Sequence, residues 1–487
     1  MSMDNIRHLV VLMLENRSFD NMVGWLYTNQ GNHPPRNIPA PPGGLTTYDG
    51  LLSQTNSAVF WNPRNEDFFS GASPVPEYVR RGVTDFRVPN PDPEEHFNHM
   101  TFQLFGPQYP WRGAPNQMKG FYLDYAHASA NPADIMQCYD PAQVPIISKI
   151  ANDYAICDHW YASCPTQTWP NRAFVHLGTS VGKVNNYPYD PLHYNIDTIF
   201  NVLEGLRTPW GEPATWGVYN DSTLTSLTRL QLPKLWDPLL DEHFRSFEMF
   251  KQQACEGELP TYSFVEPSFV FDPNDEHPPH DVRLGERFIG DVFNAVRNGK
   301  GWSETLLVIT YDEHGGCYDH VPPPFGATPP DTASTCGELG FGFDRFGVRV
   351  PTLLVSPYIE PGTVFRSTTG VPYDHTSILA TIRDWLAIPA SEMLPSARIK
   401  AAPTFGNVLT LSTPRSEAIA EWTAFGQGDV EAFRVSPEAP PNEVQKSILV
   451  AMETKRRGRS LTVHEVHELL AKAPTRGRLI DCLKMKG

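Results

Sequence analysis

The sequence lacks the features that mark several well-defined classes of protein. Its seven cysteines include no CxxC pair and no zinc-ribbon spacing, which argues against a disulfide framework and fits a reducing compartment. No run approaches the ~18–20 apolar residues that cross a bilayer, so we expect no transmembrane segment. Lys and Arg total 39 against 55 Asp and Glu, a net charge of −16, which argues against nucleic acid as a partner.

The start of the chain has no segment typical of a cleavable signal peptide. The apolar run at residues 9–14 is followed directly by Glu15-Asn16-Arg17 and has no small-residue cleavage site. We therefore expect a buried strand there and, by default, a cytoplasmic protein. Export by a route that needs no leader is the alternative.

Proline is abundant, whereas glycine is ordinary. The 487 residues include 47 prolines and 35 glycines, and the proline share is about twice the usual ~5%. Hydrophobic residues make up 40% of the chain, which is enough for a large core. We expect a globular protein with long loops stiffened by proline.

Continuous apolar runs and helical patterns alternate along the chain. The runs Ile6–Leu14, Leu306–Tyr311 and Val350–Val355 are typical of strands covered on both faces, as in a parallel sheet. Apolar residues at helical spacing over Leu284–Val296 and Ile378–Trp385 predict helices. This order predicts an α/β fold: a central, mostly parallel sheet flanked by helices, with functional groups at the strand ends.

The composition and periodicity of the sequence change twice. Residues from about 29 to 117 are rich in Pro, Asn, Asp and aromatics with little periodicity, and we expect them to be loops that cover one rim of the sheet. We therefore predict a main domain at residues 1–435 and a small helical extension at 436–487. Helices are expected in the extension at Asn442–Lys455 and Thr462–Ala473.

Acidic and amide side chains follow two of the predicted strands. Glu15 and Asn16 come directly after the first run, and Asp312 and Glu313 follow Tyr311. If the two strands are neighbours, three carboxylates meet at one edge and need a cation, because like charges raise each other's pKa and buried charge is costly. Oxygen ligands favour Ca²⁺, Mg²⁺ or Mn²⁺ over zinc. Alternatively, each pair only caps a helix or faces water.

A threonine lies where a helix is expected to begin. Pro170 suits the first turn of a helix, which places Thr168 at or just before the N-terminus. The unpaired amides and the helix dipole favour an anion there. The hydroxyl of Thr168 is therefore either an ordinary N-cap or a nucleophile that attacks a phosphorus atom held at the same amides.

Several histidines stand beside acidic residues. We single out His96, His277 and His280 as proton carriers or ligand contacts, because histidine titrates near neutral pH. Each alone is more often structural. His96 and His99 have the i,i+3 spacing of a zinc pair, but no third ligand of suitable spacing follows.

Four segments together resemble the phosphoesterase family, which contains bacterial and plant non-specific phospholipases C and AcpA-type acid phosphatases. The segments are Glu15–Asn21 (ENRSFDN), Met136–Asp158, the Thr-x-Pro-Asn-Arg run at Thr168–Arg172, and Thr310–Pro324 (TYDEHGGCYDHVPPP). The resemblance extends from the N-terminus to about Ile388. It implies a core like that of alkaline phosphatase.

The resemblance also implies roles for individual residues. One divalent metal ion is expected at Glu15, Asn16, Thr168, Asp312 and Glu313. His96 and His277 are expected to contact phosphoryl oxygens or to move protons, and Asn171 and His280 to bind substrate. Trp169 and the neighbouring hydroxyl of Thr166 depart from the family pattern, as does the helical extension.

We therefore expect a metal-dependent phospholipase C that acts through a phosphothreonine intermediate. Phosphatidylcholine and similar phospholipids would give diacylglycerol and a phosphorylated head group, and peripheral contact with a membrane would follow. Aromatic residues between Trp25 and Trp111 suit a choline head group. The alternative within the family is an AcpA-like acid phosphatase that acts on soluble phosphomonoesters.

Two alternative functions lie outside phosphoester hydrolysis. Residues 178–182 spell the G-x-S-x-G of a serine hydrolase around Ser180, but Asn185-Asn186 and Pro188 oppose the helix that must follow it. The second alternative is a structural calcium site on a scaffold without catalytic activity.

Overall fold

The computed structural model describes residues 3–38, 45–52, 59–107, 117–222, 224–416 and 435–484. At its centre is a nine-stranded sheet in the order β10-β9-β11-β1-β12-β13-β7-β14-β2. The strands are β1 (His8–Leu14), β2 (Arg36–Asn37), β7 (Ala155–Cys157), β9 (Trp216–Asn220), β10 (Phe244–Ser246), β11 (Tyr262–Glu266), β12 (Thr305–Tyr311), β13 (Thr352–Val355) and β14 (Thr363–Phe365).

The sheet is mostly parallel, as the continuous apolar runs predict. β1 pairs in parallel with both β11 and β12, and in the described sheet only β13 runs antiparallel to both of its neighbours. Every residue of β12, and every residue of β1 from Leu9 on, is buried. Strands buried on both faces need no polar alternation, so the predicted α/β class is confirmed.

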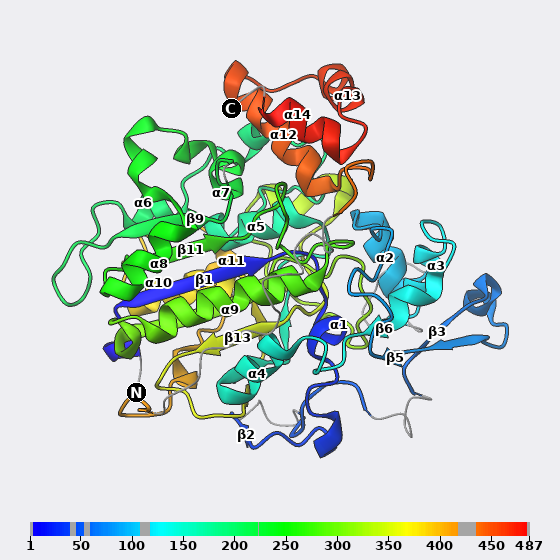
Figure 1. Ribbon diagram of the computed structural model, residues 1–487, viewed down its shortest axis with the longest axis horizontal. Coiled ribbons are helices and arrows are strands. Elements are labelled where there is room, and N and C mark those ends of the chain that lie inside the picture. The colour runs from blue at the N-terminus through cyan, green and yellow to red at the C-terminus, as the bar shows by residue number, and fades with distance from the viewer. Residues whose placement is uncertain are drawn as a thin grey trace.

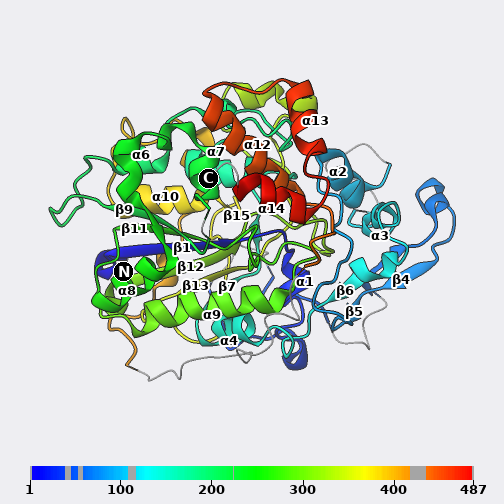
Figure 2. The same cartoon turned by 45° about the horizontal axis from the view of Figure 1, so that its top comes forward.

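Helices cover both faces of the sheet (Figures 1 and 2). One layer contains α4 (Pro145–Asp153), α8 (Phe247–Glu256) and α9 (Val282–Asn298), and the other contains α5 (Thr168–Leu177), α6 (Ile199–Leu203) and α10 (Thr376–Trp385). The helices predicted around residues 284–296 and 378–385 are therefore confirmed as α9 and α10.

The sequence places Asn298-Gly299 after the apolar pattern of α9, which predicts a C-terminal cap at the glycine, but the structure uses this glycine for another reason. Gly299 has φ −72°, so it does not adopt the left-handed conformation of a common C-terminal cap. A Cβ atom on Gly299 would instead lie 2.1 Å from the carbonyl oxygen of Ala254 at the end of α8. Glycine is needed there because two helices approach each other closely.

Part of the predicted loop region forms a small lobe beyond the carboxyl end of β1 (Figure 1). It contains α2 (Phe97–Phe105), β3 (Trp61–Pro63) and β4 (Pro76–Tyr78) from that region, together with α3 (Phe121–Tyr125), which follows the region. Leu104, Phe105 and Phe121 belong to a buried cluster separate from the core under the sheet. The expectation of loops alone is therefore wrong for this region, although 39–44, 53–58 and 108–116 lie outside the described residues.

The C-terminal extension is helical, as predicted. It consists of α12 (Glu443–Arg457), α13 (Val463–Ala471) and α14 (Arg476–Lys484). A capping box of Thr462 and Glu465, typical of helix starts in sequence, begins α13, and a second one, of Asn442 and Gln445, begins α12. No helix in the described ranges is both long and apolar enough to span a membrane.

The extension shares its core with the sheet. Val444, Ile448, Leu449 and Leu479 are buried in the same hydrophobic cluster as β1 and β12. Gln445 also donates from Nε2 to the carbonyl oxygen of Phe269 at 3.0 Å. These contacts predict that the extension and the main domain unfold together.

Substitution of Leu449 tests this coupling. Leu449→Ala removes a fully buried side chain and should lower the free energy of unfolding by about 2–5 kcal/mol. Tryptophan fluorescence during urea unfolding checks the effect, because no tryptophan follows Trp422 in the sequence and the signal reports on the main domain alone. Val463→Ala, at a position that is 53% exposed, is the control. An unchanged urea midpoint for Leu449→Ala would show that the extension unfolds separately.

Candidate active site

The register of β1 and β12 brings the two predicted acidic pairs to one edge of the sheet. Leu14 lies opposite Tyr311, so the residues that follow each strand emerge side by side. The backbone N–H of Asn16 donates to Oδ1 of Asp312 at 2.9 Å. The predicted adjacency of the pairs is therefore present. The alternative in which the pairs face water is wrong, because all four residues are fully buried.

Glycine makes the close approach of the two strand ends feasible. Gly315 has φ +59°, and a Cβ atom on it would lie 2.2 Å from the carbonyl oxygen of Asn16. Asn16 itself has φ +54°, a conformation that asparagine tolerates better than most residues. Backbone conformation at both strand ends thus fixes where the polar side chains point.

Thr168 is the first residue of α5, and its hydroxyl meets the acidic cluster. The N-cap of α5 is Gln167, whose side chain makes no capping hydrogen bond. Oγ1 of Thr168 lies 3.2 Å from Oε2 of Glu15 and 3.4 Å from Oδ1 of Asn16. The N-cap alternative for Thr168 is therefore wrong, because its hydroxyl faces the ends of β1 and β12.

Arg172 is a member of the site that sequence analysis missed. Its guanidinium contacts Oε1 of Glu15 through Nε at 2.7 Å and through a terminal nitrogen at 2.5 Å. Both side chains are at most 1% exposed. Arg172 follows Thr168 by one helical turn, a spacing that places both side chains on one face of α5. The arginine neutralises Glu15 and leaves Oε2 of Glu15 toward Thr168.

The remaining carboxylates lack such compensation. Oδ2 of Asp312 and Oε1 of Glu313 are buried and have no hydrogen-bond partner within the described ranges. Burial raises the pKa of both groups, and for Glu313 the neighbouring charge of Asp312 adds to the effect. The other oxygen of Glu313 accepts a hydrogen bond from the N–H of Gly315 at 2.7 Å. These unpaired oxygens, with those of Glu15, Asn16 and Thr168, form a donor set that suits a hard divalent cation.

His277 faces the same cluster through two carboxylates that were not predicted. Its Nε2 lies 3.4 Å from Oε1 of Glu95, and Glu95 accepts a hydrogen bond from Nδ2 of Asn16 at 2.6 Å. Asp92 completes a group in which one potential ligand atom of each of Asp92, Glu95 and His277 lies within 4.8 Å of the others. Burial lowers the pKa of His277 to about 4.

The other predicted histidines line a cavity of about 310 Å³ next to this group. His96 precedes α2, is 40% exposed, and lies 3.4 Å from Glu94. His280 is buried, and its Nδ1 contacts Oδ1 of Asp275 at 2.6 Å. Asp92 and Glu95 line the same cavity, so both histidines lie at the approach to the cluster.

Asn171 holds the turn that precedes α5. Its Nδ2 donates to the carbonyl oxygen of Thr166 at 2.8 Å, and its Oδ1 accepts from the N–H of Cys164 at 3.1 Å. The amide thereby positions Thr168. Contact of Asn171 with substrate stays a prediction.

The serine hydrolase alternative is wrong. Ser180 follows the end of α5 at Leu177 and not a strand. Its hydroxyl donates to the carbonyl oxygen of Lys183 at 2.7 Å. The sharp strand-to-helix turn that exposes such a nucleophile is therefore missing at Ser180.

The chain is similar to known proteins over most of its length. Residues 6–389 match the Phosphoesterase family. The chain is 31% identical to non-specific phospholipase C6 of Arabidopsis thaliana, over 97% of this chain and 87% of the relative. It is 26% identical to non-hemolytic phospholipase C of Burkholderia pseudomallei, over 81% of this chain and 57% of the relative.

Among solved structures, one similar chain is a protein of the alkaline phosphatase superfamily from Vibrio parahaemolyticus. It shares 14% identity and covers 54% of this chain and 67% of its own, with a TM-score of 0.31. The family match alone decides the class: the chain belongs to the Phosphoesterase family. The predicted enzyme class, phosphoric ester hydrolase, is thereby confirmed.

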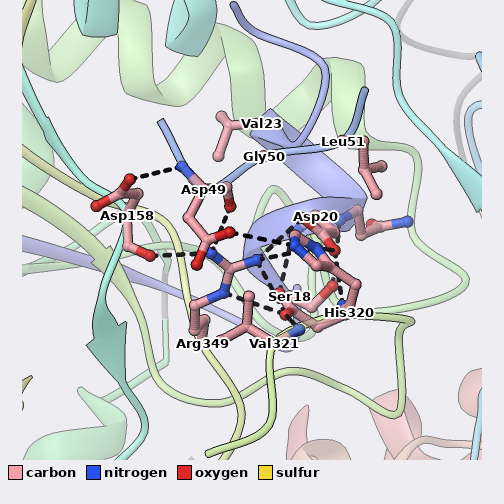
Figure 3. Close-up of polar contacts among 12 residues, drawn as sticks. Ser18, Asp20, Val23, Asp49, Gly50, Leu51, Asp158, His320, Val321 and Arg349 are labelled. Atoms are coloured by element: carbon pink, nitrogen blue, oxygen red, sulfur yellow. Dashed lines mark hydrogen bonds and ion pairs between the residues drawn. The ribbon is translucent and has the colours of Figure 1, made fainter. Parts of the chain in front are cut away.

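A second polar network lies beside the cluster and was not predicted (Figure 3). Asp20 and Asp319 each lie 3.0 Å from the guanidinium of Arg349. His320 contacts Asp20 through Nδ1 at 2.6 Å and Asp49 through Nε2 at 3.3 Å. Asp20, Asp319 and His320 also lie close enough together to bind a metal ion, but Arg349 already supplies the positive charge. Contacts of Asp49 with His320 and Arg349 hold the segment around Asp49 against the main domain.

This network should make stability depend on pH. Burial alone would lower the pKa of His320, but the charge of Asp20 and hydrogen bonds to Asp20 and Asp49 outweigh it and raise the pKa to about 9. A raised pKa in the folded state adds stability that is complete below pH ~6.5 and is lost as pH rises toward 9. The loss should be on the order of 3 kcal/mol.

Urea unfolding at pH 6.5 and pH 9 checks this expectation. The free energy of unfolding of the unmodified protein should fall between the two values, and His320→Gln should reduce the fall. His464→Gln, at a side chain that is 83% exposed, should leave it unchanged. Equal pH dependence in the unmodified protein and His320→Gln would contradict the assigned role of the network.

Proposed function

We propose that the protein is a metal-dependent phospholipase C that uses Thr168 as its nucleophile. The observation that carries the proposal is the position of the Thr168 hydroxyl, which lies at the start of α5 and between Glu15 and Asn16. The names of the relatives, phospholipases C in a plant and in a bacterium, support phospholipids as the substrate class.

The first requirement is a cation for the buried oxygens. Glu15, Asn16, Thr168, Asp312 and Glu313 are the residues that would hold it, and Ca²⁺, Mg²⁺ or Mn²⁺ fits their oxygen ligands. When bound, such an ion lowers the pKa of the threonine hydroxyl and stabilises negative charge on the phosphoryl oxygens. The unpaired oxygens of Asp312 and Glu313 support this assignment.

The second requirement is activation of the hydroxyl. In the proposed reaction, Oγ1 of Thr168 forms a bond to phosphorus and its proton passes to Oε2 of Glu15, 3.2 Å away. Arg172 keeps this carboxylate in place, and the amides at the start of α5 face the developing negative charge. The bond from phosphorus to the diacylglycerol oxygen breaks, which leaves a phosphothreonine that water then hydrolyses.

The third requirement is a proton for the departing alcohol. His96 and His280 line the cavity beside the cluster, and we assign the proton transfer to this pair. Asp275 orients the imidazole of His280, as carboxylates commonly do for catalytic histidines. His277, more deeply buried, is assigned to the phosphoryl oxygens.

Substitution of the proposed nucleophile is the direct test. Thr168→Ala should lower the release of diacylglycerol and phosphocholine from phosphatidylcholine vesicles by at least about 10³-fold, because no covalent intermediate can form. Ser180→Ala is the control and should keep its activity. The same variants assayed on p-nitrophenyl phosphate show whether a soluble monoester is the better substrate, which would favour the acid phosphatase alternative. Full activity of Thr168→Ala on both substrates would overturn the proposal.

Removal of divalent cations is an independent test. Dialysis against EDTA should abolish turnover, and Ca²⁺, Mg²⁺ or Mn²⁺ should restore it, because Asp312 and Glu313 need a counter-charge. In Asp312→Asn, restoration should require a higher ion concentration, since one ligand charge is lost. Turnover that survives complete chelation would contradict metal dependence while leaving Thr168 as a possible nucleophile.

A further inference from the structure

We propose that Asp92, Glu95 and His277 form a second divalent cation site, separate from the one predicted around Thr168. One potential ligand atom of each residue lies within 4.8 Å of the other two. The proposal concerns metal binding alone and does not depend on which phosphoester the enzyme cleaves.

The three side chains lie close together. His277 is 3.4 Å from Oε1 of Glu95 through Nε2 and 3.7 Å from Oδ1 of Asp92 through Nδ1. Oδ1 of Asp92, Oε2 of Glu95 and Nε2 of His277 are buried, and none has a hydrogen-bond partner among the residues that the structure describes. Buried acceptors without a donor are costly, and a cation held by these side chains removes the cost.

The orientation of the imidazole supports a metal ligand. Nδ1 of His277 lies 2.7 Å from the carbonyl oxygen of Pro278. A carbonyl oxygen only accepts hydrogen bonds, so Nδ1 carries the proton and the lone pair of Nε2 points toward Glu95. A backbone carbonyl that fixes the tautomer in this way is common for histidines that bind metals.

The ligand types separate this site from the first one. Two carboxylates and an imidazole suit Zn²⁺, Mn²⁺ or Co²⁺, whereas oxygen ligands alone suit Ca²⁺ or Mg²⁺. Asp92 and Glu95 line the 310 Å³ cavity, which gives an ion a path from solvent. Oε1 of Glu95, the oxygen that contacts Nε2 of His277, also accepts from Nδ2 of Asn16, and this bond turns Oδ1 of Asn16 toward Thr168.

This assignment changes the expected role of His277. As a ligand, His277 would hold the cation through Nε2 and would transfer no proton to substrate, whereas His96 and His280 keep the proton transfer. Burial and the charges of Glu313 and Asp92 all raise the pKa of Glu95, and a second cation would offset this repulsion.

Zinc titration in excess Mg²⁺ tests the proposal, because Mg²⁺ occupies the oxygen site and competes poorly for imidazole. Isothermal titration calorimetry on the EDTA-treated full chain should give one equivalent of tightly bound Zn²⁺. Glu95→Gln and Asp92→Asn should each weaken this binding by at least about 10-fold. Glu94→Gln, which changes the neighbouring acid that is 43% exposed, is the matched control and should bind like the unmodified protein.

Two further measurements keep the outcome decisive. Asp312→Asn should bind zinc with the affinity of the unmodified protein. After EDTA treatment, however, Mg²⁺ should restore the turnover of Asp312→Asn less well. Failure of one site is therefore distinguishable from failure of the other. Melting temperatures in Mg²⁺ alone show whether Glu95→Gln is folded, and Zn²⁺ should raise that temperature only where Asp92 and Glu95 are intact. No zinc binding by the unmodified protein, or equal affinity in Glu95→Gln, would overturn the proposal.

Discussion

Buried negative charge at the carboxyl ends of β1 and β12 is the constraint on which the site depends. Parallel pairing of the two strands forces Glu15 and Asp312 to emerge at the same edge, where helices and the α2–α3 lobe exclude water. Charge in such a place must be paired, protonated or bound to a cation. Each buried carboxylate at these strand ends therefore needs a group that compensates its charge.

Arginine compensates some of these carboxylates and leaves others. Arg172 pairs with Glu15, and Arg349 pairs with Asp20 and Asp319. The Arg349 pairs behave as fixed structural interactions, because removing one partner would strand the other charge, whereas Glu15 keeps its second oxygen directed at Thr168. Asp312 and Glu313 form no ion pair with an arginine among the described residues. Burial raises the pKa of Asp312, and the charge of Arg172 only partly offsets that effect. Under the proposed function, these less compensated acids are the ones that would hold a cation.

The parts of the site that a single local rule decides were predictable from the sequence. Strands such as β1 and β12 are continuous apolar runs, and the residue after each run must lie at the sheet edge, so Glu15 and Asp312 were predictable from pattern alone. Arg172 and the Asp20–Arg349 network were not, because pairing between distant segments leaves no periodic signal. The lobe around α2 was also missed, since its helix is short and surrounded by residues typical of loops.

The segment before α2 shows why a residue's chemistry alone does not identify a site. Histidine was the expected functional residue of this segment, yet His96 takes the position directly before α2, where its extended backbone turns the side chain toward the cavity and solvent. The preceding residue, Glu95, therefore points inward and contacts Asn16 and His277. Successive residues of an extended backbone face opposite sides, so one step in register decides whether the interior receives an imidazole or a carboxylate. A carboxylate adds negative charge where an imidazole would not, and this raises the demand for a further cation at that end of the sheet.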